Sequence, residues 1–243
     1  MILYYLFDYH INIIKYFENK IMDGRKDYFQ FDLRTIREIW KKEMKEMKNV
    51  INLYKKYGDK GYIGEEITQL QHATQAALLA EEYYFQLPEN LRIELVLGAF
   101  LHDIGHLLIF EDDSLETMGN VGVKNHEELG ALLLEEFGFP DLTCQLVRKH
   151  ILTKRYLITV KEGYYDKLSE ASKKTFEYQG GKLSKEEIQE FEKDKYYDYH
   201  LRMRQFDDQA KSTEDKILKK IELLNPIKYY KSLIEKYIML YLI

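Results

Sequence analysis

Apolar residues recur at steps of three and four along most of this chain, which is the period of an α-helix. The clearest examples are ATQAALLAEEYYF (73–85), LRIELVLGAFLHDIGHLLI (91–109) and HEELGALLLEEF (126–137). Strand-like alternation of apolar and polar residues is scarce. The pattern therefore predicts an all-α fold.

Residues that end or begin helices stand between these segments. Pro88 follows the first, and Gly138–Pro140 follows the third. Ser184 precedes Glu187 by three residues, and this capping-box spacing predicts that another helix begins at Ser184. The polar stretch Glu111–Gly122 is predicted to be a loop. Because no repeat or linker interrupts the chain, we expect one helical domain with helical terminal extensions.

Charge and cysteine content exclude several classes of protein. Lys and Arg number 36 against 41 Asp and Glu, so a net charge of −5 argues against nucleic-acid binding. The single cysteine, Cys144, excludes an intramolecular disulfide framework and multi-cysteine metal sites. Asp8, His10 and Lys15 interrupt the apolar N-terminal stretch, so a membrane anchor or a secretory signal is not expected there. We expect a cytoplasmic protein that binds neither nucleic acid nor membrane.

Four of the seven histidines lie on or beside apolar helical segments, and acidic residues accompany them. One such histidine alone is more often a hydrogen-bonded core residue than a metal ligand. The set as a whole is different, because burying the carboxylate of Asp103 is costly without a cation or several donors. The candidate ligands are His72, His102, Asp103, His126, His150 and the acidic pair Asp207–Asp208.

The adjacent pair His102-Asp103 limits how such a metal centre is built. Neighbours on an α-helix point about 100° apart, so these two side chains do not chelate one ion side by side. They can bind different ions, or the carboxylate can bridge two. Imidazole nitrogen combined with carboxylate oxygen suits iron, manganese or zinc.

The order of these residues resembles that of the HD-domain superfamily of helical metal proteins, in its form with two extra histidines and two metal ions. Most members are phosphohydrolases. A smaller branch, which includes myo-inositol oxygenase, consists of mixed-valent di-iron oxygenases. Segments outside the ligand set are similar to the members of that branch that cleave the carbon–phosphorus bond of 2-amino-1-hydroxyethylphosphonate. They include the stretch around Tyr62 and Glu65, TKRYL after His150, and LRMRQFDDQAK (201–211).

The resemblance extends roughly from Tyr54 to Lys211 and implies an HD-domain helical bundle around a dinuclear metal site. It divides the chain into an N-terminal helical extension at 1–50, an HD-domain oxygenase core at 51–211 and a C-terminal helical extension at 212–243 that packs on the core.

The resemblance also implies the metals and their ligands. Two irons in a mixed-valent Fe(II)/Fe(III) pair are expected, with O2 as co-substrate and Asp103 as the bridge. Asp207 is preferred to Asp208 because the family ligand is the first acid before the x-x-Lys ending, which matches Phe206-Asp207. The implied ligands are His72, His102, Asp103, His126, His150 and Asp207.

Residues that handle the substrate are implied in the same way. Lys154 and His106 lie four residues after His150 and His102, so on a helix each points the same way as its ligand, toward the substrate. In the resembling enzymes the matching residues hold the phosphonate and the α-hydroxyl of the substrate. The implied substrate-binding residues are Glu65, His106, Lys154, Ser172 and Arg204.

A lid is implied before the first ligand. Tyr62 is expected to occupy an iron site until substrate displaces it, and Glu65 to pair with the ammonium group of the substrate. With His106, these two are the implied catalytic residues.

We expect an O2-dependent oxygenase that converts a 1-hydroxyphosphonate into a carboxylic acid and phosphate. A small organophosphonate such as 2-amino-1-hydroxyethylphosphonate would give glycine. The alternative is an HD-domain phosphohydrolase acting on a nucleotide or other phosphate ester, which would use the same ligands to activate water but has no need of a displaceable tyrosine. A helical binding or regulatory protein that keeps the metals for stability is disfavoured, because all six ligand types are present.

Overall fold

The computed structural model describes residues 47–62 and 64–241. Within these ranges the regular structure is helical, and the only strand-like pairs are two isolated bridges, Gly61–Thr68 and Thr117–Val123. The predicted all-α class is therefore confirmed. The chain divides into two compact units, Met1–Lys42 and Glu43–Ile243, and every described residue belongs to the second. Most of the predicted N-terminal extension lies outside the described residues.

The described helices follow the order of the sequence. A helical stretch at 47–57 comes first. It is followed by α3 (Gln69–Tyr83), α4 (Glu89–Leu101), the 3-10 helix η1 (Ile104–Phe110), α5 (His126–Glu136), α6 (Asp141–Val160), the 3-10 turn η2 (Tyr165–Lys167), α7 (Glu170–Tyr178), α8 (Lys185–Phe191), α9 (Tyr197–Gln209), α10 (Asp215–Leu224) and α11 (Pro226–Tyr241).

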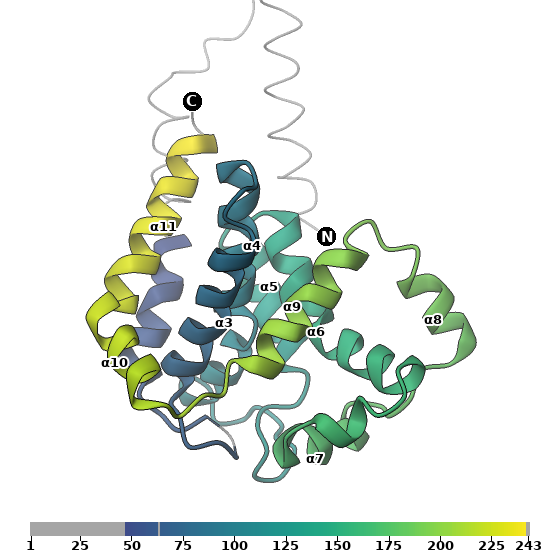
Figure 1. Cartoon of the computed structure of the whole chain (residues 1–243). Helices are drawn as coiled ribbons and strands as arrows, with labels where there is room; N and C mark the ends of the chain where they lie inside the picture. Colours follow the sequence, from purple (N-terminus) through teal and green to yellow (C-terminus); the bar gives the residue numbers. More distant parts are fainter. Residues whose placement is uncertain (1–46, 63, 242–243) are drawn as a thin grey trace, which may run out of the picture. The chain divides into compact units, whose positions relative to one another are not determined.

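Helices α3, α4, α6 and α9 pack against one another around a shared apolar core, and α5 lies on α6 (Figure 1). Ala76 and Ala77 of α3 and Leu97 and Phe100 of α4 are fully buried in this core. The two alanines allow the neighbouring backbones to approach closely. This packing holds the helices that carry the histidines at fixed positions.

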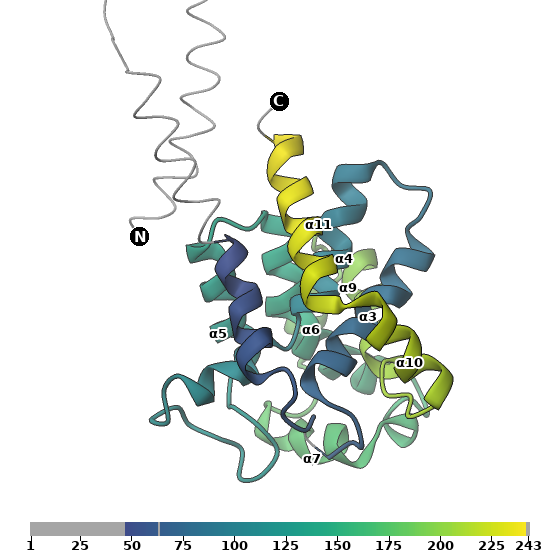
Figure 2. The same ribbon diagram turned by 90° about the vertical axis from the view of Figure 1, so that its left-hand side faces the viewer.

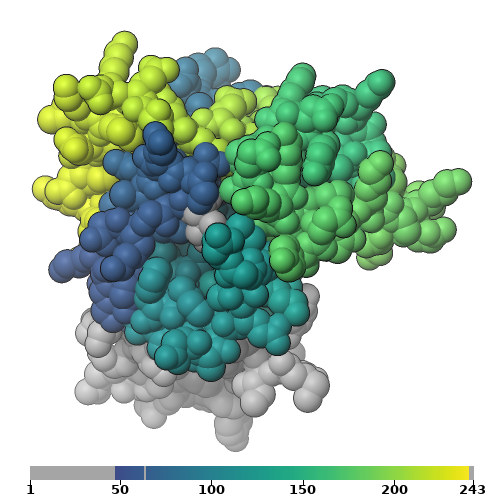
Figure 3. Space-filling view, turned by 90° about the horizontal axis from the view of Figure 1, so that it is seen from below, coloured from purple at the N-terminus to yellow at the C-terminus, as the bar shows by residue number. Residues whose placement is uncertain are grey.

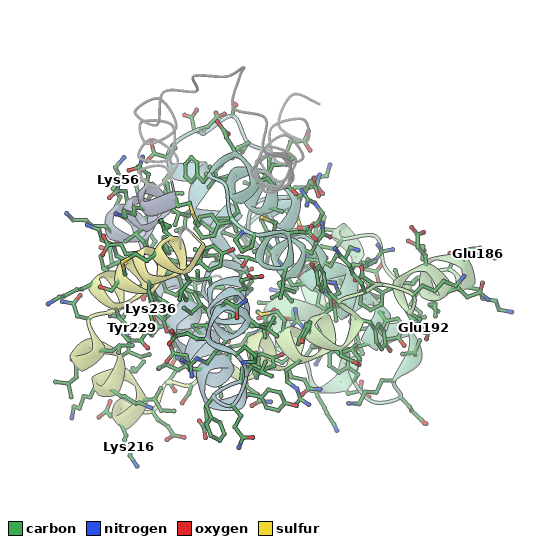
Figure 4. The ribbon with its side chains drawn as sticks, turned by 90° about the horizontal axis from the view of Figure 1, so that it is seen from above. Lys56, Glu186, Glu192, Lys216, Tyr229 and Lys236 are labelled. Atoms are coloured by element: carbon green, nitrogen blue, oxygen red, sulfur yellow. The ribbon has the colours of Figure 1, made fainter. Side chains whose placement is uncertain are left out.

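The C-terminal helix α11 packs on α4. The Tyr230 ring stacks on Phe100 with 3.9 Å between centroids, and Ile234 is fully buried. Lys236 Nζ lies 2.6 Å from a carboxylate oxygen of Glu89, in the first turn of α4. Figure 4 shows Lys236 and Tyr229 along this helix.

Local helix signals are placed as predicted. Ser184 is the N-cap of α8, where its hydroxyl accepts from the Glu187 N–H and the Glu187 side chain accepts from the Ser184 N–H. The same reciprocal box, made by Thr68 and Gln71, begins α3. No regular helix is present between Phe110 and His126, in agreement with the predicted loop.

The periodicity of the apolar segment 91–109 suggests one continuous helix, but the structure divides this segment between two helices. The α-helix ends at Leu101, and η1 leaves at an angle of 43° to α4. In this position η1 packs closely on α5, since a Cβ at Gly105 would lie 2.0 Å from the His126 carbonyl oxygen. Among the described residues no single helix is long and apolar enough to cross a membrane, and only the bent pair α4 and η1 reaches that length and composition.

Three segments gather at one end of the bundle: residues 58–68 before α3, the loop 111–125, and α7 (Figures 1 and 2). All three contribute to one pocket, which opens between them.

Candidate active site

Six buried side chains form two adjacent groups in the core. His72, His102 and Asp207 make the first, and Asp103, His126 and His150 make the second. Within each group the potential ligand atoms lie within 4.8 Å of one another. All six predicted metal ligands are thus brought together from α3, the end of α4, α5, α6 and α9.

Asp103 lies between the two groups and presents a different oxygen to each. Its Oδ2 is 3.5 Å from His72 Nε2 and 3.3 Å from His102 Nε2. Its Oδ1 is 3.4 Å from His126 Nε2 and 3.3 Å from His150 Nε2. This is the arrangement expected of a carboxylate that bridges two ions.

Backbone carbonyls define the orientation of all four imidazole rings. The Nδ1 atoms lie 2.7 to 3.2 Å from backbone oxygens: His72 from Ala210, His102 from Ala99, His126 from Val123 and His150 from Val147. If each Nδ1–H donates to its carbonyl, each Nε2 carries a lone pair that points inward.

With neutral rings, the Nε2 atoms then face one another with no proton between them. The two of His72 and His102 are 3.0 Å apart, and those of His126 and His150 are 3.1 Å apart. Facing lone pairs repel, and two carboxylates lie beside them. These six side chains, which we call the metal donor set, therefore fit bound metal cations, because imidazole nitrogen and carboxylate oxygen are typical metal ligands.

The electrostatics of the buried groups also call for positive charge at this place. Burial opposes protonation of His102, but Asp103 and Asp207 outweigh it and raise the pKa of His102 to about 10. Burial likewise disfavours the ionised carboxylates, yet His102 holds the pKa of Asp103 well below its usual range, and Arg204 does the same for Asp207. The two buried carboxylates therefore favour positive charge beside them, which a proton on His102 or a bound metal ion can supply.

Tyr62 covers one side of the metal donor set, where it contacts Asp103 and His72. Its hydroxyl donates to Asp103 Oδ2 at 2.9 Å, and its ring stacks on His72 with 3.9 Å between centroids. Burial and the nearby carboxylates raise the pKa of Tyr62 well above 10, so the phenol is a neutral donor. The predicted lid tyrosine thus contacts the carboxylate that faces both groups.

A cavity of about 50 Å³ lies directly outside Tyr62 and the metal donor set. Figure 3 shows the face on which the segment before α3, the 111–125 loop and α7 meet around it. Its lining includes all the predicted substrate-binding residues, together with others from the same elements: Tyr62, Glu65, Asp103, His106, Met118, Val121, His126, His150, Ile151, Lys154, Ala171, Ser172, Thr175, Gln179, Arg204, Asp207 and Lys211.

Two buried cations face this cavity. Lys154 is 2% exposed and donates to Thr175 Oγ1 at 3.0 Å. Burial, with Arg204 nearby, lowers the pKa of Lys154 to about 7. Arg204 is also 2% exposed; it donates to Asp207 at 2.6 Å and to Asp208. Burial disfavours its charge, but these two carboxylates raise the pKa of Arg204 well above its usual value.

Comparison with known proteins places the chain in a family. The HD domain family model matches residues 69–224, which include all six predicted ligand positions. The chain belongs to the HD-domain family.

The named relatives of this HD-domain protein are oxygenases. A [1-hydroxy-2-(trimethylamino)ethyl]phosphonate dioxygenase (glycine-betaine-forming) of Leisingera caerulea is 36% identical over 162 residues, which cover 67% of this chain and 78% of the relative. A hydroxymethylphosphonate dioxygenase of Gimesia maris is 35% identical over 164 residues, with coverage of 67% and 78%. An uncharacterised protein of Acanthamoeba polyphaga mimivirus is 37% identical over 213 residues, with coverage of 88% and 91%. The resemblance to phosphonate-cleaving HD oxygenases is confirmed.

His106 reaches the site of this HD-domain protein by a route that the spacing did not predict. The four-residue step from His102 crosses the end of α4, so the two do not share a helical face. His106 instead stacks on His126 with 3.7 Å between centroids, and its Nδ1 accepts from the Val123 N–H at 3.1 Å. Lys154, by contrast, shares α6 with His150 as predicted.

Three sets of contacts in the site were not predicted from the sequence. Asp208 and Tyr164 both contact Arg204, and the four-residue step from Arg204 to Asp208 on α9 is a recognisable ion-pair spacing. Thr175 binds Lys154 from α7. Lys211 contacts Glu65 and Ser172, which are far away in the chain. No pattern in the nearby sequence predicts the contact of Thr175 with Lys154 or the contacts of Lys211.

Proposed function

We propose that this chain catalyses the O2-dependent cleavage of the carbon–phosphorus bond of a 1-hydroxyphosphonate. The products are a carboxylic acid and phosphate. Both atoms of O2 are accounted for in these products, and the four electrons that O2 accepts come from the substrate, so no external reductant is needed. For 2-amino-1-hydroxyethylphosphonate, the substrate that the resemblance names, the acid is glycine.

The observation that carries the proposal is the position of two buried cations beside the metal donor set. A phosphonate is a small dianion, and Lys154 and Arg204 both line a cavity that the donor set also lines. Charged donors in a buried pocket bind such an oxyanion strongly. The names of the two relatives support the same class of substrate.

We propose two irons, in a mixed-valent Fe(II)/Fe(III) pair, as the metals. The ligands would be His72, His102 and Asp207 for one and His126 and His150 for the other, with Asp103 between them. Nitrogen and oxygen donors without a thiolate are compatible with iron. Bound there, the irons would supply O2 binding and electron transfer.

The residues of the chain position the substrate. Lys154 and Arg204 hold the phosphonate oxygens, with Ser172 and His106 as further polar contacts to the phosphonate and its hydroxyl. Tyr62 keeps its hydroxyl on Asp103 until a substrate enters the cavity and takes its place. Glu65 faces the tail of the substrate. Lys154 and Arg204 are almost completely buried, which strengthens their charged contacts with the substrate.

The test is phosphate release by iron-loaded protein from 2-amino-1-hydroxyethylphosphonate and hydroxymethylphosphonate, with and without O2. We expect phosphate only with O2, and two irons per chain by elemental analysis. Phosphate released from a phosphate monoester without O2 would instead support the phosphohydrolase alternative.

A matched pair of histidine variants links activity to the metal centre. His150→Gln should lose metal and activity together. His200→Gln replaces a histidine of α9 that is equally buried but contacts Asp194 outside the site, and it should keep both.

A further inference from the structure

The two named relatives act on hydroxyphosphonates that differ in their tails. One substrate carries a trimethylamino group on its second carbon, and the other has no second carbon. Identities of 36% and 35% do not separate the two choices for this chain. The structure of the pocket distinguishes between a cationic tail and none, provided that the proposed function is correct.

Glu65 is the carboxylate in the pocket lining that is not part of the metal donor set. It is the group that would attract a positively charged tail. In this chain its Oε1 already lies 3.3 Å from Lys211 Nζ, and both side chains are largely buried, at 17% and 14% exposure. An internal cation thus lies beside the carboxylate and balances its charge, although Oε1 itself has no hydrogen-bond partner among the described residues.

Lys211 is anchored by more than this ion pair. Its Nζ donates to Ser169 Oγ at 3.1 Å and to Ser172 Oγ at 3.3 Å, at the beginning of α7. With Glu65, these acceptors surround the ammonium group. Lys211 follows α9, so its side chain connects three separate segments at the mouth of the cavity. A substrate cation would have to displace it or approach it.

The rest of the cavity is also unfavourable for a cationic tail. Besides Lys211, the basic side chains of Lys154 and Arg204 line the same space. Its other carboxylates, Asp103 and Asp207, belong to the metal donor set and would be neutralised by bound metals. Quaternary ammonium groups are usually bound by aromatic cages. Here Tyr62 is the one phenol or phenyl ring among the described lining residues, and one of its faces is stacked on His72.

We propose that Lys211 is a specificity-determining residue that neutralises Glu65 and selects against cationic tails. The preferred substrates are then small 1-hydroxyphosphonates with a neutral tail or none, such as hydroxymethylphosphonate or 1-hydroxyethylphosphonate. A positively charged group at the second carbon lowers kcat/KM. Removing Lys211 leaves Glu65 free to bind that group.

The experiment compares kcat/KM for phosphate release from 1-hydroxyethylphosphonate and 2-amino-1-hydroxyethylphosphonate, which differ by one amino group. Wild-type protein should favour the neutral substrate by roughly tenfold or more. Lys211→Met should shift the ratio toward the amino substrate by a similar factor. Lys211→Arg, which keeps the charge, should retain the wild-type ratio.

A second substitution shows that the effect acts through Glu65. In the double variant Lys211→Met/Glu65→Gln the amino substrate should gain nothing, because no free carboxylate remains to bind it. Lys173→Met is the matched control, since Lys173 lies next to Ser172 but pairs with Glu170 at the surface. It should leave the ratio unchanged.

The outcomes are distinguishable. A wild-type preference for the amino substrate overturns the role of Lys211, and this measurement needs no variant to fold. An unchanged ratio in a folded, iron-loaded Lys211→Met protein overturns it as well. If no 1-hydroxyphosphonate releases phosphate with O2, the proposed function itself fails and the inference fails with it.

Discussion

Replacing Lys154 by Met should lower activity and raise stability at the same time. Burial, with Arg204 nearby, lowers the pKa of Lys154 from 10.5 to about 7. Because each pKa unit corresponds to about 1.36 kcal/mol, keeping this ammonium charged costs the folded protein on the order of 5 kcal/mol below pH 7. Met fills the same space without a charge. We expect the free energy of unfolding at pH 7 to rise by about 2–4 kcal/mol.

Activity should change in the opposite direction. Lys154 would hold a buried dianion, and losing a charge-assisted contact of this kind costs about 2–4 kcal/mol in transition-state binding. At 1.36 kcal/mol per factor of ten, kcat/KM should fall by about 30- to 1000-fold.

The assay is phosphate release from hydroxymethylphosphonate, measured together with urea unfolding and iron content of the same preparation. Lys161→Met is the control, because Lys161 is exposed just beyond the end of α6. A folded, iron-loaded Lys154→Met protein with kcat/KM within threefold of the wild type would refute the role of Lys154 in binding the phosphonate. A marked loss of stability would refute the stated cost of its charge.

Three other changes test separate parts of the site. In the wild type kcat/KM should fall as pH rises through about 7, because Lys154, whose pKa is lowered to about 7, loses its positive charge there. Lys154→Arg should move this fall to higher pH, and an unchanged pH profile would show that Lys154 does not cause it. Tyr62→Phe should keep the metal content but speed the oxidation of the resting centre in air, followed spectroscopically, since the hydrogen bond from the tyrosine hydroxyl to Asp103 is lost. Gly105→Ala should lower Tm and metal content, because its Cβ would lie 2.0 Å from the His126 carbonyl oxygen, whereas Gly61→Ala, with no atom within 4 Å of its Cβ, should lower neither.

Part of the candidate site could be located from the sequence because the signals are local, and the family resemblance supplied the remaining residues and roles. A helical period in apolar residues, a capping box at Ser184 and a His-Asp pair in an apolar segment each depend on neighbours within one or two turns. Burial of Asp103 implied a cation from the chemistry of the carboxylate alone. Lys154 could be placed beside His150 because both lie on α6, where a four-residue step does keep one face.

The tertiary structure decided what depends on distant segments. Helix α4 ends at Leu101, directly before His102, and η1 packs closely on α5 at Gly105, a contact that apolar periodicity does not record. The same break directs His106 onto His126. Lys211 meets Glu65 only because the chain after α9 returns to the segment before α3. Residue type and helical period are properties of a short stretch of chain, but the partner of a buried charge is set by which stretches pack together.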